Sequence, residues 1–158
     1  MTGNHPKILV YGYGNPGRQD DGLGVVLAEE VARWCKDDQL VYVDTDTNYQ
    51  LNVEDAAVIA GYDMVIFADA SQEDVPAFRF DRLMPSAKTE FTMHAVSPGF
   101  ILHLCKQLFS REPETYLLHI RGYEWEFMNE MTEKARANLH EAFVYVKAFI
   151  SDFPRSNA

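Results

Sequence analysis

The chain has 158 residues, of which 47% are hydrophobic, and its 24 acidic and 14 basic residues give a net charge of −10. This size and composition are typical of one soluble globular domain, expected over residues 1–158 with 154–158 as a flexible tail. The acidic balance argues against nucleic-acid and membrane partners, because phosphate groups are bound by patches of Lys and Arg. The apolar runs are too short to cross a bilayer, and the polar N-terminus has no signal core, so a cytoplasmic protein is expected.

Apolar runs and helical periods alternate along the chain, a pattern typical of α/β folds. The predicted elements are, in order, strand 8–13, helix 21–36, strand 40–44, helix 50–59, strand 64–70, strand 77–83, helix 97–109, strand 115–121 and helix 132–153. The run MVIFADA at 64–70 is expected in the centre of the sheet, and 77–83 at an edge. Cys35 and Cys105 fall in helical apolar patterns and are expected to be buried free thiols. We therefore expect a single-domain, three-layer α/β/α fold with a twisted, mostly parallel sheet of about five strands.

The first predicted strand ends in the glycine-rich sequence GYGNPG, residues 12–17. It matches the dinucleotide pattern G-x-G-x-x-G, with Asp44 at the end of the next strand as a candidate ribose-binding acid. Against this function, Asp20 and Asp21 place two negative charges where the pyrophosphate would bind. In a purely structural interpretation, the glycines permit tight turns and one of the two aspartates, Asp20 by preference, caps the helix.

Two carboxylates and one imidazole are predicted at the same edge of the sheet. Asp21 follows the first strand, Asp69 ends the central strand, and His94 precedes the helix that begins at Ser97. Open α/β sheets bind ligands outside the carboxyl ends of their strands, so these side chains form a candidate three-ligand metal site with open positions. The other histidines, His5, His103, His119 and His140, are interpreted as structural or exposed. The chain has neither H-E-x-x-H nor G-x-S-x-G, so the residues alone do not indicate proteolysis.

Several motifs, in this order, resemble those of the hydrogenase maturation endopeptidases. The most specific is GYGNPGRQDDGLG at residues 12–24, and it is followed by FADA at 67–70. A histidine motif, HAVSP at 94–98, comes next, and IRGYE at 120–124 precedes the final helix. The resemblance covers nearly the whole chain.

The resemblance implies an aspartyl-type endopeptidase, a hydrolase that removes the C-terminal extension of a [NiFe] hydrogenase large-subunit precursor after nickel insertion. Asp21, Asp69 and His94 take the positions of the family's metal-contacting and catalytic residues. The nickel is supplied by the substrate, and other divalent metals can substitute for it. A second alignment would place Gly99 at the histidine position, but the spacing to the following helix favours His94. Asp46 is a further candidate for an acidic role.

Two other functions stay open from the sequence. One is a dinucleotide- or phosphate-binding module that uses the loop from Gly12 to Gly17. The other is a non-catalytic metal-binding maturation chaperone with the same three ligands.

Overall fold

The computed structural model describes residues 5–87 and 96–153. Its elements are, in chain order, β1 (Ile8–Tyr13), the 3-10 turn η1 (Gln19–Gly22), α1 (Leu23–Asp37), β2 (Val43–Asn48), α2 (Asp55–Ile59), β3 (Met64–Ser71), β4 (Phe78–Arg82), α3 (Pro98–Phe109), β5 (Glu114–Arg121) and α4 (Glu133–Asp152). No helix in this part of the chain is long and apolar enough to cross a membrane.

The five strands form one sheet in the order β2-β1-β3-β5-β4. The pairs β1–β2, β1–β3 and β3–β5 are parallel, and only the edge strand β4 runs antiparallel, against β5. The run MVIFADA therefore lies at the centre of the sheet, as predicted, and its residues from Met64 to Ala68 are buried.

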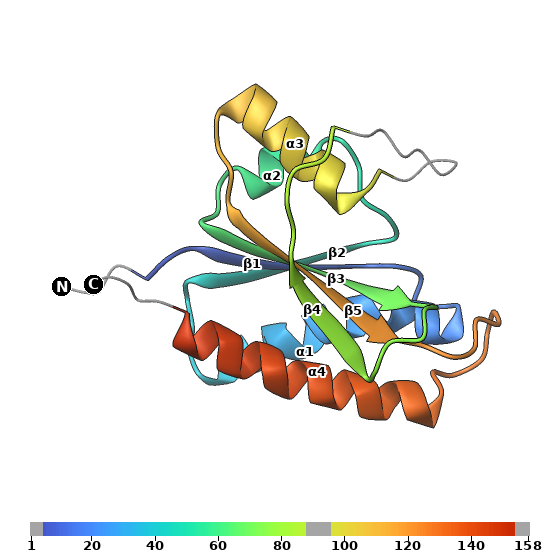
Figure 1. Cartoon of the computed structure of the whole chain (residues 1–158). Coiled ribbons are helices and arrows are strands. Elements are labelled where there is room, and N and C mark those ends of the chain that lie inside the picture. The colour runs from blue at the N-terminus through green and yellow to red at the C-terminus, as the bar shows by residue number, and fades with distance from the viewer. Residues whose placement is uncertain (1–4, 88–95, 154–158) are drawn as a thin grey trace.

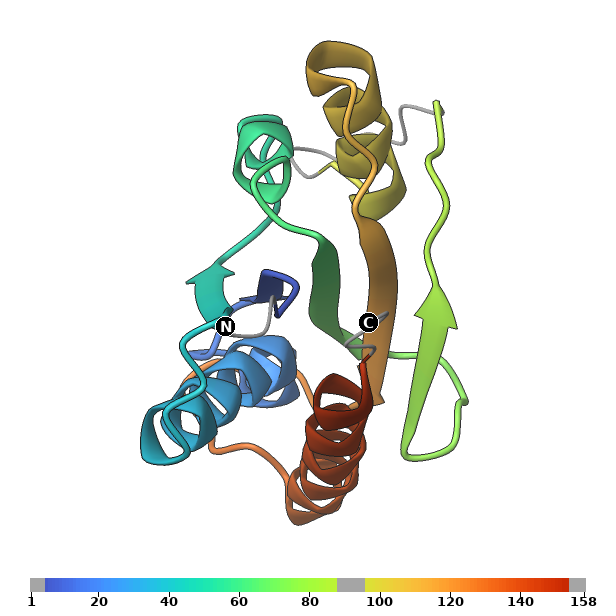
Figure 2. The same cartoon turned by 90° about the vertical axis from the view of Figure 1, so that its left-hand side faces the viewer.

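Helices cover both faces of the sheet and make three layers (Figures 1 and 2). Alternate strand residues, such as Ile66 and Leu118, pack with the long helices α1 and α4. The residues between them, such as Phe67 and Leu9, pack with α2 and α3. Because each strand side chain changes face at every step, one sheet supplies both apolar cores. The predicted three-layer α/β/α fold with a mostly parallel five-stranded sheet is confirmed.

Most helix and strand positions agree with the prediction, and the main errors lie around β2. The second strand is Val43–Asn48, not 40–44, so the polar stretch predicted as a loop is part of the sheet. This edge strand is mostly exposed, and polar side chains can therefore occupy it without a buried face. The following helix is only Asp55–Ile59, five residues instead of ten. Helices α3 and α4 begin where predicted, with the hydroxyls of Ser97 and Thr132 accepting hydrogen bonds from Phe100 N and Ala135 N.

Two glycines bring α1 directly onto the sheet. A Cβ atom on Gly12 would lie 2.0 Å from the carbonyl oxygen of Gly24, and one on Gly24 would lie 2.2 Å from that of Ala68. Any larger residue at either position would push the first turn of α1 away from β1 and β3. The glycines of the motif thus set the position of the segment that carries Asp20 and Asp21.

Candidate functional site

The carboxyl ends of β1 and β3 lie next to each other. Gly12 pairs with Ala68 in the parallel register, so the following residues, Tyr13 and Asp69, leave the paired region side by side. The turn η1 packs against β3 at the same end of the sheet. The segments that carry Asp21 and Asp69 therefore meet at the carboxyl end of the sheet, where open α/β proteins bind their ligands.

Asp69 is a half-buried carboxyl group whose pKa is raised to about 7. Burial is the main cause, and the negative charge of Asp21 raises the pKa further. The backbone N–H of Ala70, 2.8 Å from Oδ1, and the hydroxyl of Tyr13 donate hydrogen bonds that oppose the shift. Asp69 therefore exchanges a proton near neutral pH, and a cation beside both carboxylates would favour its ionised form.

The backbone of the glycine loop holds Asp21. The N–H of Asn15 donates to Asp21 Oδ2 at 3.0 Å. Gly14 has a φ of +133°, and a Cβ on it would lie 2.2 Å from the carbonyl oxygen of Asp21. One carboxylate oxygen is thereby fixed, and the close approach of two backbone segments requires glycine at position 14.

Asp20 has a different role from its neighbour. It is fully buried, and its carboxylate accepts hydrogen bonds from Tyr123 N, Glu124 N, Thr132 N and the Thr132 hydroxyl at 2.7–3.1 Å. The prediction that one of these aspartates caps the following helix is wrong, because Gly22 occupies the N-cap of α1 and no side chain caps it. Asp20 instead joins the motif to the segment that connects β5 and α4.

The predicted imidazole, His94, lies outside the described residues. Gly99, the alternative position, is buried in the first turn of α3, where a Cβ would lie 3.2 Å from Ser86 Cβ. Within residues 5–87 and 96–153, no three His, Cys, Asp or Glu side chains come together closely enough to hold a metal ion. In that part of the chain, two hard oxygen donors, Asp21 and Asp69, are available to a divalent cation, and a third ligand has to come from elsewhere.

Sequence reasoning missed two neighbours of Asp69. Tyr13 donates to Asp69, and its own pKa is raised by burial and by the Asp69 charge. His119 pairs with Asp69 across β3 and β5, and burial lowers the pKa of its imidazole. The strand order β1-β3-β5 brings these strands together, and their register in the folded chain places both residues on the same face as Asp69. Of the other histidines, His5 stacks on Tyr42, while His103 and His140 lie on helices.

Asp44 does not end its strand at the glycine loop. It is the second residue of β2 and pairs with Leu9, while Gly12 lies opposite Thr47. Its carboxylate accepts a hydrogen bond from the Tyr62 hydroxyl at 2.7 Å. The ribose-binding position predicted for Asp44 is therefore wrong. Asp46 is exposed on the same strand and accepts a hydrogen bond from Thr47 N.

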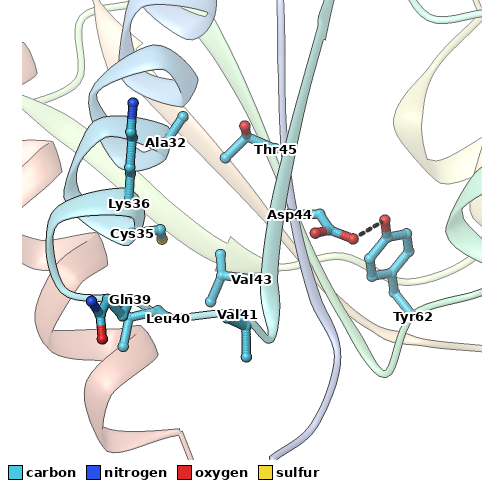
Figure 3. Close-up of a pocket in the computed structure, with 10 residues that line it drawn as sticks. All are labelled: Ala32, Cys35, Lys36, Gln39, Leu40, Val41, Val43, Asp44, Thr45 and Tyr62. Carbon is cyan, nitrogen blue, oxygen red and sulfur yellow. Dashed lines mark hydrogen bonds between the residues drawn. The ribbon is translucent and has the colours of Figure 1, made fainter.

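A hollow of about 870 Å³ opens at the opposite end of the sheet, between the end of α1 and the beginning of β2 (Figure 3). Asp44 is its acidic side chain and Lys36 its basic one. Val43, which lines the hollow, pairs with Ile8, the first residue of β1. The hollow is thus separated from Asp21 and Asp69 by the length of the strands.

No family model matches the chain, and no curated protein matches it by sequence. Solved structures do match. The [NiFe] hydrogenase maturation protease HycI from Thermococcus kodakarensis KOD1 has a TM-score of 0.72 at 18% identity, covering 92% of this chain and 93% of that one. The hydrogenase maturating endopeptidase HybD from E. coli has a TM-score of 0.68 at 21% identity, covering 96% and 99%. The hydrogenase 2 maturation peptidase from a Thaumarchaeota archaeon has a TM-score of 0.64 at 22% identity, covering 92% and 98%.

These structures match the chain over nearly its whole length and over nearly theirs. The TM-scores of 0.64–0.72 show a shared fold, although the sequence identities are only 18–22%. The structural likeness agrees with the motif resemblance at residues 12–24, 67–70 and 120–124. The chain therefore has the fold of the [NiFe] hydrogenase maturation proteases, as its motifs predicted.

Proposed function

We propose that this protein is a cytoplasmic endopeptidase that removes the C-terminal extension of a [NiFe] hydrogenase large-subunit precursor after nickel insertion. The observation that carries the proposal is the electrostatic coupling of Asp21 and Asp69 at the carboxyl end of the sheet. Perturbed carboxyl groups of this kind gather at functional sites. The shared fold with maturation proteases supports the choice of reaction.

In this proposal the nickel belongs to the substrate, and Asp21, Asp69 and His94 bind it there. Carboxylates and an imidazole, without a thiolate, bind free nickel weakly. A precursor that already holds nickel supplies the remaining ligands, so the ternary complex is tighter than either binary one. If nickel raises the affinity of the enzyme for the precursor by some factor, linkage requires that the precursor raise the affinity of the enzyme for nickel by the same factor.

The chemistry assigned to the metal is that of a Lewis acid. Nickel held between enzyme and substrate would position the scissile region and polarise its carbonyl or an attacking water. Asp69, whose pKa is about 7 in the free enzyme, would release its proton when nickel binds beside it. Asp21, fixed by Asn15 N, would keep its free oxygen toward the metal.

The test compares nickel-loaded and metal-free precursor of a large subunit from the organism that encodes this chain, each incubated with the enzyme. Intact-mass measurement should show loss of the extension from the loaded precursor only, and a chelator should stop it. Equal cleavage of both forms would contradict nickel recognition while keeping the protease. Nickel-dependent binding without cleavage would instead identify a maturation chaperone.

A further inference from the structure

Tyr13 is the last residue of β1 and lies beside Asp69 of β3. Its ring packs with the apolar core on the α2/α3 face of the sheet, where it meets the ring of Phe67 edge-on, with 6.5 Å between the ring centroids. Asp69 is two residues after Phe67 on the same strand, so its side chain is on the same face. The Tyr13 hydroxyl donates a hydrogen bond to the Asp69 carboxyl group. A phenol held by ring packing thus contacts a carboxyl group on the neighbouring strand.

The three residues from Tyr13 to Asn15 contact both carboxyl groups of the candidate site. The Tyr13 hydroxyl donates to Asp69, and Asn15 N donates to Asp21 Oδ2 at 3.0 Å. Gly14, between them, has a φ of +133°, a conformation that residues with side chains rarely adopt. One short segment, bent at a glycine, therefore sets where the two carboxyl groups lie relative to each other.

Asp69 needs such support because its surroundings disfavour its charge. Burial and the negative charge of Asp21 favour the protonated form, whereas the hydrogen bonds from Ala70 N and from Tyr13 favour the ionised form that binds a cation. Because like charges repel, an unrestrained Asp69 side chain would turn away from Asp21. Hydrogen bonds that orient a metal-binding carboxylate are typical of metal sites, and removing one lowers metal affinity or activity by roughly 10–100-fold.

Tyr11 makes an equivalent hydrogen bond two residues earlier on β1. Its hydroxyl donates to Asp55 Oδ2 at 2.9 Å, and the same carboxylate accepts a bond from Asn52 N at 2.8 Å. Asp55 is buried at the beginning of α2, whereas Asp69 lies at the carboxyl end of the sheet. Strand β1 thus carries two tyrosine–aspartate pairs of the same chemistry, one in the core and one at the candidate site.

We propose that Tyr13 is a positioning residue whose hydroxyl holds the Asp69 carboxylate in place, so that Asp69 and Asp21 bind the same metal ion of the substrate. This inference rests on the proposed function and assigns a role to a side chain outside the metal-binding set. Tyr13 acts through Asp69 and not by touching the metal or the peptide. Its effect should therefore disappear when Asp69 loses its carboxylate.

The test compares Tyr13→Phe with the matched control Tyr11→Phe, each of which removes one hydroxyl and keeps the ring. Tyr13→Phe should lower kcat/KM for the nickel-loaded large-subunit precursor by roughly tenfold. The ratio of the affinities for the loaded and the metal-free precursor, measured by calorimetry, should fall by a similar factor, with the affinity for the metal-free form unchanged.

Tyr11→Phe should leave kcat/KM and both affinities unchanged. Its Tm should fall at least as far as that of Tyr13→Phe, because the Tyr11 hydroxyl bonds Asn48 as well as Asp55. A loss of cleavage that came only from weaker folding would therefore be at least as large in the control.

A double-mutant cycle tests whether Tyr13 acts through Asp69. In an Asp69→Ala background, which lacks the acceptor, adding Tyr13→Phe should change kcat/KM by less than about twofold. The same tenfold loss in both backgrounds would show that Tyr13 acts independently of Asp69 and would overturn the proposal. If the parent cleaves the loaded precursor and Tyr13→Phe keeps the parental kcat/KM and affinity ratio, the positioning role is wrong and the protease stands. If the parent does not cleave the loaded precursor, the proposed function itself fails and this role fails with it.

Discussion

The carboxylates at the two ends of the sheet differ in their burial and in their hydrogen-bond partners. At the amino end, beside the 870 Å³ hollow, Asp44 is exposed and bonded to Tyr62, and Asp63 forms an exposed 3.8 Å ion pair with Arg111. At the carboxyl end, Asp20 is fully buried with four hydrogen bonds, and Asp69 is half-buried with its pKa raised to about 7.

The 870 Å³ hollow and the perturbed carboxyl group of Asp69 thus lie at opposite ends of the sheet, so the size of a hollow does not identify the candidate site. The exposed carboxylates at the amino end are also solvated by water, so their hydrogen bonds and ion pairs contribute little to stability. At the carboxyl end, hydrogen-bond donors compensate the burial of Asp20. The charges of Asp21 and Asp69 instead repel each other, a cost in free energy that is typical of functional sites. Removing a carboxylate at the carboxyl end should therefore have a larger effect than removing one at the amino end.

The largest expected effect is on cleavage. Asp21→Asn and Asp69→Asn should each lower kcat/KM for the nickel-loaded precursor by roughly 100–1000-fold, because each removes a charge placed at the reacting centre. Asp44→Asn, at the amino end, should change kcat/KM by less than about twofold. Single-turnover cleavage followed by mass spectrometry measures all three, and a large loss in Asp44→Asn would abolish the distinction between the two ends.

The next effect is on stability. Asp20→Ala should lower the free energy of unfolding by about 4 kcal/mol, since several buried donors in residues 123–132 lose their acceptor at once. Asp63→Ala, an exposed control, should lower it by less than about 0.5 kcal/mol. Urea denaturation followed by circular dichroism gives both values. A small change in Asp20→Ala would mean that water replaces the carboxylate and that residues 123–132 are not held by it.

The third effect depends on pH. The folded-state pKa of Asp69 is about 7 against an ordinary value of 3.8, so the folded protein binds the extra proton and its stability falls as pH rises from about 4 to 7. Asp69→Asn removes this loss. The variant should therefore gain roughly 4 kcal/mol relative to the parent between pH 4 and pH 8, since each unit of pKa difference corresponds to about 1.4 kcal/mol. Parallel denaturation curves at the two pH values check this, and an equal difference at both would show that Asp69 is not coupled to folding.

Local patterns in the sequence were enough to predict most of the fold. The apolar run 64–70 and the Ser97-Pro98 helix start are encoded by neighbouring residues, and the structure has them where expected. Strand β2 was misplaced because its pairing with β1 comes from backbone hydrogen bonds and not from apolar side chains. An edge strand of this kind has no hydrophobic pattern to read.

The candidate site was only partly predictable, because its contacts are nonlocal. The placement of Asp21 and Asp69 at one edge follows from strand order, which an α/β pattern suggests. The partners of Asp20 are more than a hundred residues away, so only the folded chain distinguishes it from Asp21. Tyr13 and His119 became neighbours of Asp69 through register, which a single sequence does not specify.

The smallest expected effect is on the pH dependence of nickel binding at Asp69. If nickel in the precursor binds Asp69, it must displace the proton that Asp69 holds below about pH 7. Nickel-dependent affinity for the precursor should then fall about tenfold for each pH unit below 7, one proton being displaced per metal. A second proton, on His94, would steepen the fall, because an imidazole must be neutral to bind a metal. Calorimetry at pH 5.5, 6.5 and 7.5 gives the affinities of the nickel-loaded and the metal-free precursor. Their ratio is the nickel-dependent part of the affinity. Asp44→Asn should follow the parental curve, since its exposed carboxylate lies at the other end of the sheet. A flat curve would mean that the metal does not meet Asp69, and the two carboxylates would then need another role.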